Sequence, residues 1–252
     1  MELGLRDRVF VVTAASTGLG LATATSLVSE GARVALVARR SQALALAVQN
    51  LGGADHAVAL TADLGAADTP QRAVDLALTS FGRLDGAFIS VGGPPKGRVL
   101  QNTDQQWADA FEYVFMAALR SVRAVLAVNK SARLGLVLST SVKSPMNELA
   151  ISNGFRPGLG MLIKQLADEI GPDGGRVFGL MPGWMATDRT KTMMAAAADP
   201  QAALQAAESA VPLRRTGAPE ELGQVAAFML SDVASYVTGC VIPVDGGSLR
   251  CL

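Results

Sequence analysis

The stretch Val9-Phe-Val-Val-Thr-Ala-Ala-Ser-Thr-Gly-Leu-Gly20 decides the fold. Val9 to Val12 form an apolar run of strand length, and a glycine-containing turn then leads into a helical pattern. A strand, a tight turn and a helix in this order place unpaired backbone N–H groups and the positive end of a helix dipole at one point. The sequence therefore predicts a phosphate site at this turn, with an ordinary βα turn as the alternative.

Short apolar runs alternate with helix-patterned segments along the rest of the chain, which is typical of βαβ units and a parallel sheet. We expect strands at 8–13, 33–38, 57–62, 85–91, 134–139, 175–181 and 240–244. We expect helices at 18–31, 41–51, 68–81, 104–128, 149–170, 190–209 and 219–230. This pattern predicts an α/β fold of the Rossmann type, a doubly wound three-layer sandwich around a seven-stranded parallel sheet, formed by residues 1–252 as a single domain.

Composition excludes several classes of function. Of the 252 residues, 22 are Lys or Arg and 22 are Asp or Glu, so no overall charge attracts nucleic acid or an anionic membrane. No stretch approaches the roughly 18 apolar residues that a membrane span needs. The two cysteines, Cys240 and Cys251, form no disulfide framework, and the N-terminus has no signal-peptide pattern, so we expect a cytoplasmic protein. With one histidine as well, we expect no metal site.

The end of the second expected strand reads Ala38-Arg39-Arg40. In dinucleotide-binding folds an acid at this place accepts the 2′-hydroxyl of NAD, whereas a cation pairs with the 2′-phosphate of NADP. No carboxylate is present here to repel a phosphate, and arginine can bind one through two hydrogen bonds. These residues favour NADP(H) over NAD(H), with two solvated arginines as the alternative.

Several motifs resemble those of the short-chain dehydrogenase/reductase family over nearly the whole chain. The turn matches the family's Thr-Gly-x-x-x-Gly-x-Gly except at Ala14, a substitution that is tolerable only if φ there is negative. Asp63-Leu64, Pro182-Gly183 with Thr187-Asp188, and Val244-Asp-Gly-Gly247 match later motifs. The resemblance assigns these residues to the cofactor: Thr13, Ser16, Thr17, Gly18, Leu19, Gly20, Arg39, Arg40, Asp63, Leu64, Gly92, Arg156, Pro182, Gly183 and Thr187.

The family's catalytic pattern is a Ser, a Tyr thirteen residues later, and a Lys four residues after the Tyr. Ser139 falls on the serine, but the tyrosine position holds Ser152 and the lysine position holds Arg156. The helical asparagine of the family is replaced by Val114. An aliphatic hydroxyl is far less acidic than a phenol, and a guanidinium does not exchange a proton near neutral pH, so the family's standard mechanism is not expected.

Other residues are weaker candidates. Lys143, in the loop after Ser139, is a possible proton donor if it is desolvated, although such lysines are usually solvated. Tyr113 is expected in the core and His56 on the surface. The segment 194–200 is either a helical lid or part of an ordinary surface helix.

Three functions remain open. The resemblance implies a divergent reductase similar to the β-ketoacyl type, which acts on a small-molecule or acyl-thioester carbonyl through an unconventional proton donor; alternatives are a catalytically silent homologue that binds cofactor or assembles with partners, and a scaffold that binds no cofactor. The family also implies a homo-oligomer, a dimer or tetramer. We expect the small-residue stripe on 104–128 to mediate it: Ala110, Val114, Ala117, Ala118, Ser121 and Val125.

Overall fold

A seven-stranded sheet, entirely parallel, forms the centre of the molecule in the computed structural model, which describes residues 2–251. Its strands are β1 (Val9–Thr13), β2 (Arg33–Ala38), β3 (Ala57–Thr61), β4 (Gly86–Ile89), β5 (Arg133–Val137), β6 (Arg176–Pro182) and β7 (Cys240–Val244). The strand order is β3-β2-β1-β4-β5-β6-β7, so the chain reverses direction across the sheet between β1 and β4. The predicted seven-stranded doubly wound sheet is confirmed, and a crevice is expected where β1 and β4 end.

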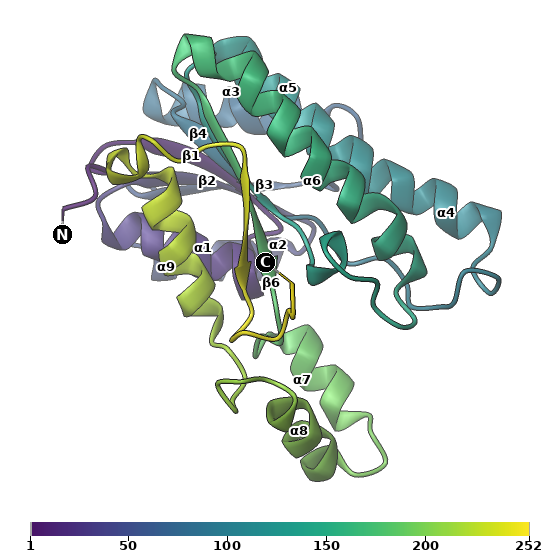
Figure 1. The fold of residues 1–252 in the computed structure, drawn as a ribbon. Helices are drawn as coiled ribbons and strands as arrows, with labels where there is room; N and C mark the ends of the chain where they lie inside the picture. Colours follow the sequence, from purple (N-terminus) through teal and green to yellow (C-terminus); the bar gives the residue numbers. More distant parts are fainter. Residues whose placement is uncertain (1, 252) are drawn as a thin grey trace.

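Helices cover both faces of the sheet because alternate strand residues point to opposite sides. Phe10 and Val12 pack with α1 (Gly18–Ser29), α2 (Ser41–Asn50) and α9 (Pro219–Leu230). Val9 and Val11 belong to the core on the other face. That face is covered by α3 (Thr69–Phe81), α5 (Ala117–Val128) and α6 (Ala150–Ile170), and α4 (Asp104–Ala110) leads toward α5. Figure 1 shows the two helical layers on either side of the strands.

The segment expected as one helix at 104–128 contains a change of helix type. A π-helical turn, η1 (Phe111–Met116), joins α4 to α5 without a break in the chain direction. Such turns occur mostly as single insertions in α-helices and are frequent at functional sites. Short 3₁₀ turns also occur at Thr140–Val142, Gly171–Asp173 and Asp232–Ala234.

The prediction of one continuous helix at 190–209 is wrong. The structure has α7 (Asp188–Ala195) and α8 (Pro200–Ser209), which extend together beyond the sheet (Figure 1). Pro200 cannot continue an incoming helix, and the Asp199 side chain accepts a hydrogen bond from the Ala202 N–H at 3.0 Å and caps the new one. The Ala-rich segment 194–200 spans the end of α7, the connection at residues 196–199 and the first residue of α8.

The oligomer prediction required the small-residue stripe to face outward, but in the structure the stripe is buried. Ala110, Val114 and Ala117 are fully buried, and Ala118, Ser121 and Val125 are at most 5% exposed. Most of them pack in the core that α5 shares with the sheet. Small residues let this helix approach the chain's own strands closely, so the stripe has no surface left for a second copy.

The conformation of Ala14 also differs from expectation. Its φ is +50°, in the left-handed region, whereas the sequence required a negative value. The turn adopts this shape because α1 lies directly on it: a Cβ on Gly20 would lie 2.6 Å from the Ala14 carbonyl oxygen and 2.8 Å from that of Thr13. Ala14 therefore carries the conformation for which the family motif uses glycine, at a cost of about 1–2 kcal/mol.

Replacing Ala14 with glycine should raise the free energy of unfolding by about 0.5–1 kcal/mol, since relief of the strain exceeds the added freedom of the unfolded chain. Denaturant unfolding of the purified protein measures this change. Ala15→Gly is the matched control, because Ala15 is fully buried and has no positive φ. That variant should lose stability. An equal loss in Ala14→Gly would show that the left-handed conformation of Ala14 is not strained.

Among the described residues, no helix is both long enough and apolar enough to cross a bilayer.

Candidate functional site

Two cavities meet at the carboxyl ends of the strands. The first, here called the β1–β4 cavity, has a volume of about 590 Å³ and lies beside the β1–α1 turn. The second, here called the α6–α7 cavity, has a volume of about 790 Å³ and lies between the start of α6 and the α7–α8 extension. Gly93 lines both, so a long ligand can extend from one to the other past this residue.

The β1–β4 cavity brings together most of the residues predicted for the adenosine half of a cofactor. Those that line it are Ser16, Thr17, Arg39, Arg40, Asp63, Leu64 and Gly92. Thr17 precedes α1 without a capping hydrogen bond from its side chain, so that side chain satisfies none of the N–H groups of the first turn. Those donors and the helix dipole together favour a phosphate at this turn.

Thr13, which was expected to contact the cofactor, lies buried at the end of β1. It is 1% exposed, and its hydroxyl donates to the Ser90 carbonyl at 2.6 Å and accepts from the Ser90 N–H at 2.8 Å. These bonds join the end of β1 to the segment after β4. Thr13 therefore shapes the crevice from behind, and its hydroxyl is not among the groups that line either cavity.

The two arginines after β2 are both exposed but differ in their contacts. Arg40 donates to the Thr17 hydroxyl at 2.7 Å and to the Ser16 hydroxyl at 3.3 Å, which holds it against the turn. Arg39 has no hydrogen bond or ion pair from its side chain to any described residue, although it lines the β1–β4 cavity. Asp63 accepts a hydrogen bond from the Gly65 N–H at 2.9 Å, so its carboxylate is held at the rim of the same cavity.

The α6–α7 cavity contains most of the predicted residues of the reaction end. Ser139, Ser152, Arg156, Pro182, Gly183, Thr187 and Leu19 line it. Lys143 does not line either cavity; it caps the short turn after Ser139 and is exposed, so its suggested role as a desolvated proton donor is not supported by its position.

Hydrogen bonds to Ser141, a residue that was not expected here, link the two predicted serines. Ser152 is 6% exposed, and its hydroxyl lies 3.2 Å from that of Ser141. The Ser141 N–H in turn donates to the Ser139 hydroxyl at 3.1 Å. Ser152 and Ser139 are therefore linked through Ser141, which the family spacing does not single out.

Arg156 is a buried cation at the bottom of this cavity. It is 5% exposed and donates to the Val137 carbonyl, while its Nε has no hydrogen-bond partner. Burial, with a smaller contribution from nearby Arg189, lowers the pKa of the Arg156 guanidinium to about 10. The group is still charged at neutral pH.

The π-helical turn places two residues beside this region. Val114 is fully buried and offers no polar atom from its side chain. Tyr113 is half-buried and packs against the core, as expected, but it also lines the β1–β4 cavity. Burial raises the pKa of the Tyr113 phenol, and the charges of Arg189 and Arg156 oppose this shift only in part.

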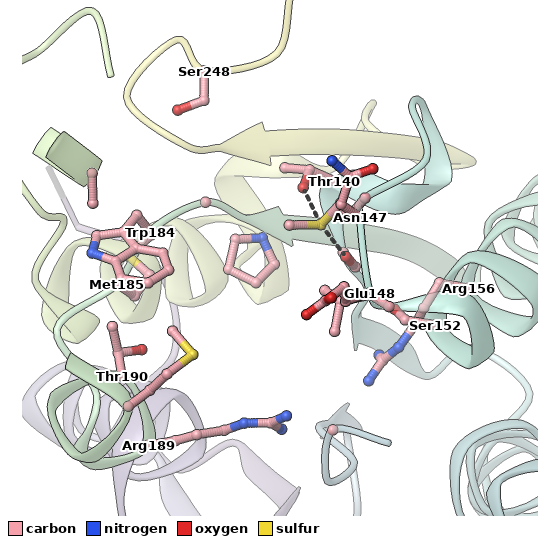
Figure 2. Close-up of a pocket in the computed structure, with 18 of the residues that line it drawn as sticks. Thr140, Asn147, Glu148, Ser152, Arg156, Trp184, Met185, Arg189, Thr190 and Ser248 are labelled. Carbon is pink, nitrogen blue, oxygen red and sulfur yellow. Dashed lines mark hydrogen bonds between the residues drawn. The ribbon is translucent and has the colours of Figure 1, made fainter. Parts of the chain in front are cut away.

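Two charged residues of the α6–α7 cavity were missed by the sequence patterns. Glu148 points into the cavity from a left-handed backbone conformation, φ +57°, and the Gly97 N–H donates to its carbonyl at 2.8 Å (Figure 2). Arg189 follows Thr187-Asp188 directly and reaches over to Gly93, where an added Cβ would lie 1.7 Å from Nη1. Only the folded backbone brings both to one place.

His56 is exposed on the surface, as expected. The lid residues 194–200 do not themselves line the cavity, but Met193 of α7 and Ala207 of α8 do. Among residues 2–251 no group of three or more His, Cys, Asp and Glu side chains has the arrangement of a metal site.

The family model and the relatives found by comparison with known proteins are all reductases or oxidoreductases. A family model described as "Enoyl-(Acyl carrier protein) reductase" matches residues 13–248. Levodione reductase of Leifsonia aquatica is 33% identical over 255 residues, 96% of this chain and 94% of that protein. L-Sorbose reductase of Gluconobacter frateurii, solved with NADPH and L-sorbose, has a TM-score of 0.93 at 28% identity over 100% of both chains. An NADPH-bound short chain oxidoreductase of Pseudomonas aeruginosa PAO1, described as containing an atypical catalytic centre, has a TM-score of 0.91 at 27% identity over 99% of both chains.

Proposed function

Because this chain belongs to the short-chain dehydrogenase/reductase family, we propose that it is an NADP(H)-dependent oxidoreductase of carbonyl compounds with a divergent catalytic centre. The observation that carries the cofactor preference is the pair Arg39 and Arg40 beside a cavity whose only acid, Asp63, lies at the end of the neighbouring strand β3. Arg39, which has no partner in the described chain, is available for a 2′-phosphate. NADPH bound to the solved relatives from G. frateurii and P. aeruginosa supports the same choice.

The residues present fit such a cofactor. A Cβ on Gly20 would collide with two carbonyl oxygens of the turn, so only glycine lets α1 begin this close to a pyrophosphate. The turn and the arginines would hold the adenosine half in the β1–β4 cavity. Pro182, Gly183, Thr187 and Arg156 would hold the nicotinamide half in the α6–α7 cavity. When bound, the cofactor supplies or accepts the hydride.

The chain's own groups would then orient the carbonyl. Ser139 lines the cavity and can donate from its hydroxyl to a carbonyl oxygen, and Ser152, which also lines the cavity, is hydrogen-bonded to Ser141. Arg156 keeps the positive charge that a lysine supplies in the family, and its guanidinium can donate to the ribose of the nicotinamide half. No described tyrosine lines the α6–α7 cavity, so the proton would reach the product from another group or from water.

Titration of the protein with NADPH and NADH by calorimetry tests the proposal. NADPH should bind at least about tenfold more tightly, because a charge-assisted contact to the 2′-phosphate contributes about 1.5–3 kcal/mol. Equal dissociation constants would remove the preference, and no binding of either cofactor would favour a scaffold without cofactor.

A catalytically silent homologue is the second candidate. Two observations favour it. The Ser152 hydroxyl is buried and hydrogen-bonded to Ser141, and Val114, at the position of the family's asparagine, has no side-chain polar atom to hold a relay water. Loss of reduced-nicotinamide absorbance on mixing with activated ketones separates the two candidates: NADPH binding without any turnover would support the silent protein.

We also propose a cytoplasmic homo-oligomer, but through a different surface from the buried stripe. The outer side of α6 and the π-helical turn expose Met161 at 75% and Phe111 at 40%. Light scattering should report a dimer or tetramer, and Met161→Glu should shift it toward monomer because a buried charge in an apolar interface is costly. Leu46→Glu, at a 56% exposed site on α2, is the matched control and should change nothing. A monomeric unmutated protein would contradict this proposal.

A further inference from the structure

Two arginines from different elements face the same end of the α6–α7 cavity. Arg156 comes from α6 and Arg189 from α7. Figure 2 shows both guanidinium groups directed toward the space between them, with Ser152 beside Arg156. They are close enough for the charge of Arg189 to lower the pKa of Arg156. Arg189 is exposed, so water can solvate its charge, whereas Arg156 is 5% exposed and its charge is costly unless something neutralises it.

No described part of the chain neutralises them. None of the ion pairs among residues 2–251 includes either arginine. The only hydrogen-bond acceptor for Arg156 is the Val137 carbonyl, and its buried Nε has none. Arg189 reaches only the Pro94 carbonyl, at 3.5 Å. Glu148 lines the same cavity but lies outside ion-pair distance of both.

Burying a charge without a counterion is expensive, so native proteins pair such groups or use them to bind ligands. The cofactor groups expected near Arg156 are ribose hydroxyls, which accept hydrogen bonds but carry no charge. An oxyanion fits both guanidinium groups, because carboxylate and phosphate oxygens match the donor geometry of arginine. The rest of the cavity is largely apolar, with Met146, Leu149, Met185 and Leu249 among its walls.

From this arrangement we propose, resting on the proposed function, that the substrate is a carbonyl compound with an apolar body and an oxyanion group, a carboxylate or phosphate, which binds between Arg156 and Arg189. The positive charge replaces the missing tyrosine as the feature that selects and orients the substrate. Ser139 would then contact the carbonyl while the arginines hold the acidic end. This assigns Arg156 and Arg189 as residues that determine specificity.

Calorimetric binding of matched aldehydes tests the assignment at fixed ionic strength, with and without saturating NADP⁺. The probes are 4-formylbenzoate, its neutral methyl ester, and 4-formylphenyl phosphate. The unmutated protein should bind at least one of the two anions about tenfold or more tightly than the ester, and the better anion shows which oxyanion fits. Arg156→Met and Arg189→Met should each bring this preference to within about twofold, with little change in ester affinity.

Arg123→Met is the matched control, because Arg123 is exposed on α5 and lines neither cavity. It should keep the full preference. If Arg156→Met fails to fold, which circular dichroism would show, Arg189→Met decides, since Arg189 lies exposed at the cavity. Equal binding of the ester and both anions by the unmutated protein, or an unchanged preference in Arg189→Met, would overturn the proposal.

The same binding experiment tests the oxyanion site separately from the proposed reductase function. An anion preference in a protein that binds no NADPH would leave the oxyanion site standing and reject the reductase. NADPH binding without an anion preference would reject the oxyanion site and leave the proposed reductase function standing. Arg189 also borders the passage between the cavities, so a loss of NADPH affinity in Arg189→Met with an intact anion preference would assign it to the cofactor instead.

Discussion

The triple substitution Ser152→Tyr, Arg156→Lys and Val114→Asn should reduce an activated neutral ketone such as trifluoroacetophenone about 10²- to 10⁴-fold faster than Ser152→Tyr alone. This is the range that a positioned general acid contributes. The single substitution supplies a phenol, but it lacks the lysine that passes the proton on and the asparagine that holds a relay water. Initial rates of NADPH oxidation at saturating cofactor measure the difference.

The positions in the fold explain why three changes are needed. Ser152 and Arg156 are one helical turn apart on α6, and Val114 belongs to the π-helical turn between α4 and α5, which packs against α6. All three side chains are at most 6% exposed, so a polar side chain at one position depends on partners at the others. Asparagine at 114 without the tyrosine and lysine would only bury an unsatisfied amide.

The matched control is Ser152→Phe together with Arg156→Lys and Val114→Asn. Phenylalanine has the bulk of tyrosine without the hydroxyl, so this variant should show no gain, and it separates proton transfer from changes in packing. A single Ser152→Tyr variant as active as the triple variant would show that these positions do not correspond to the family's catalytic residues.

The sheet could be predicted because its information is local. Alternating apolar residues such as Phe10 and Val11 determine which face of β1 packs with which helices, and the turn glycines mark where α1 begins. The candidates at the two ends of the crevice had other sources, because Arg39 was proposed from its place after the second strand and Thr187 from a family motif. These residues lie at strand ends, and parallel strands end at one edge of a sheet.

The misses share a physical reason. The left-handed conformation of Ala14 follows from the close approach of α1, and the buried state of Ala117 follows from close packing on the sheet; neither is encoded in the neighbouring residues. Ser141, Glu148 and Arg189 belong to loops or helix starts far apart in sequence, and only the tertiary fold brings them to one cavity. Periodicity detects faces of elements but does not detect which side chains converge in space.

Arg39→Asp should reverse the cofactor preference, and this is the sharpest test of the adenosine end. The substitution removes the cation available to the 2′-phosphate and places a carboxylate where it repels that phosphate but can accept the 2′-hydroxyl of NAD. NADPH affinity should fall by about tenfold or more, and NADH should become the tighter ligand. Arg39 is the better choice than Arg40, because Arg40 is bound to the hydroxyls of Ser16 and Thr17 and its loss would also loosen the turn.

Arg39→Gln is the matched control for this charge reversal. It keeps an N–H donor on a shorter side chain but has no charge, so it should abolish the preference without favouring NADH. Raising the ionic strength should weaken the preference of the unmutated protein in the same direction, because Arg39 is exposed and exposed charges are screened. If Arg39→Asp retained the NADPH preference while Arg40→Asp lost it, the arginine held by Ser16 and Thr17 would be the phosphate ligand, since its contacts to the turn would then position it for that role.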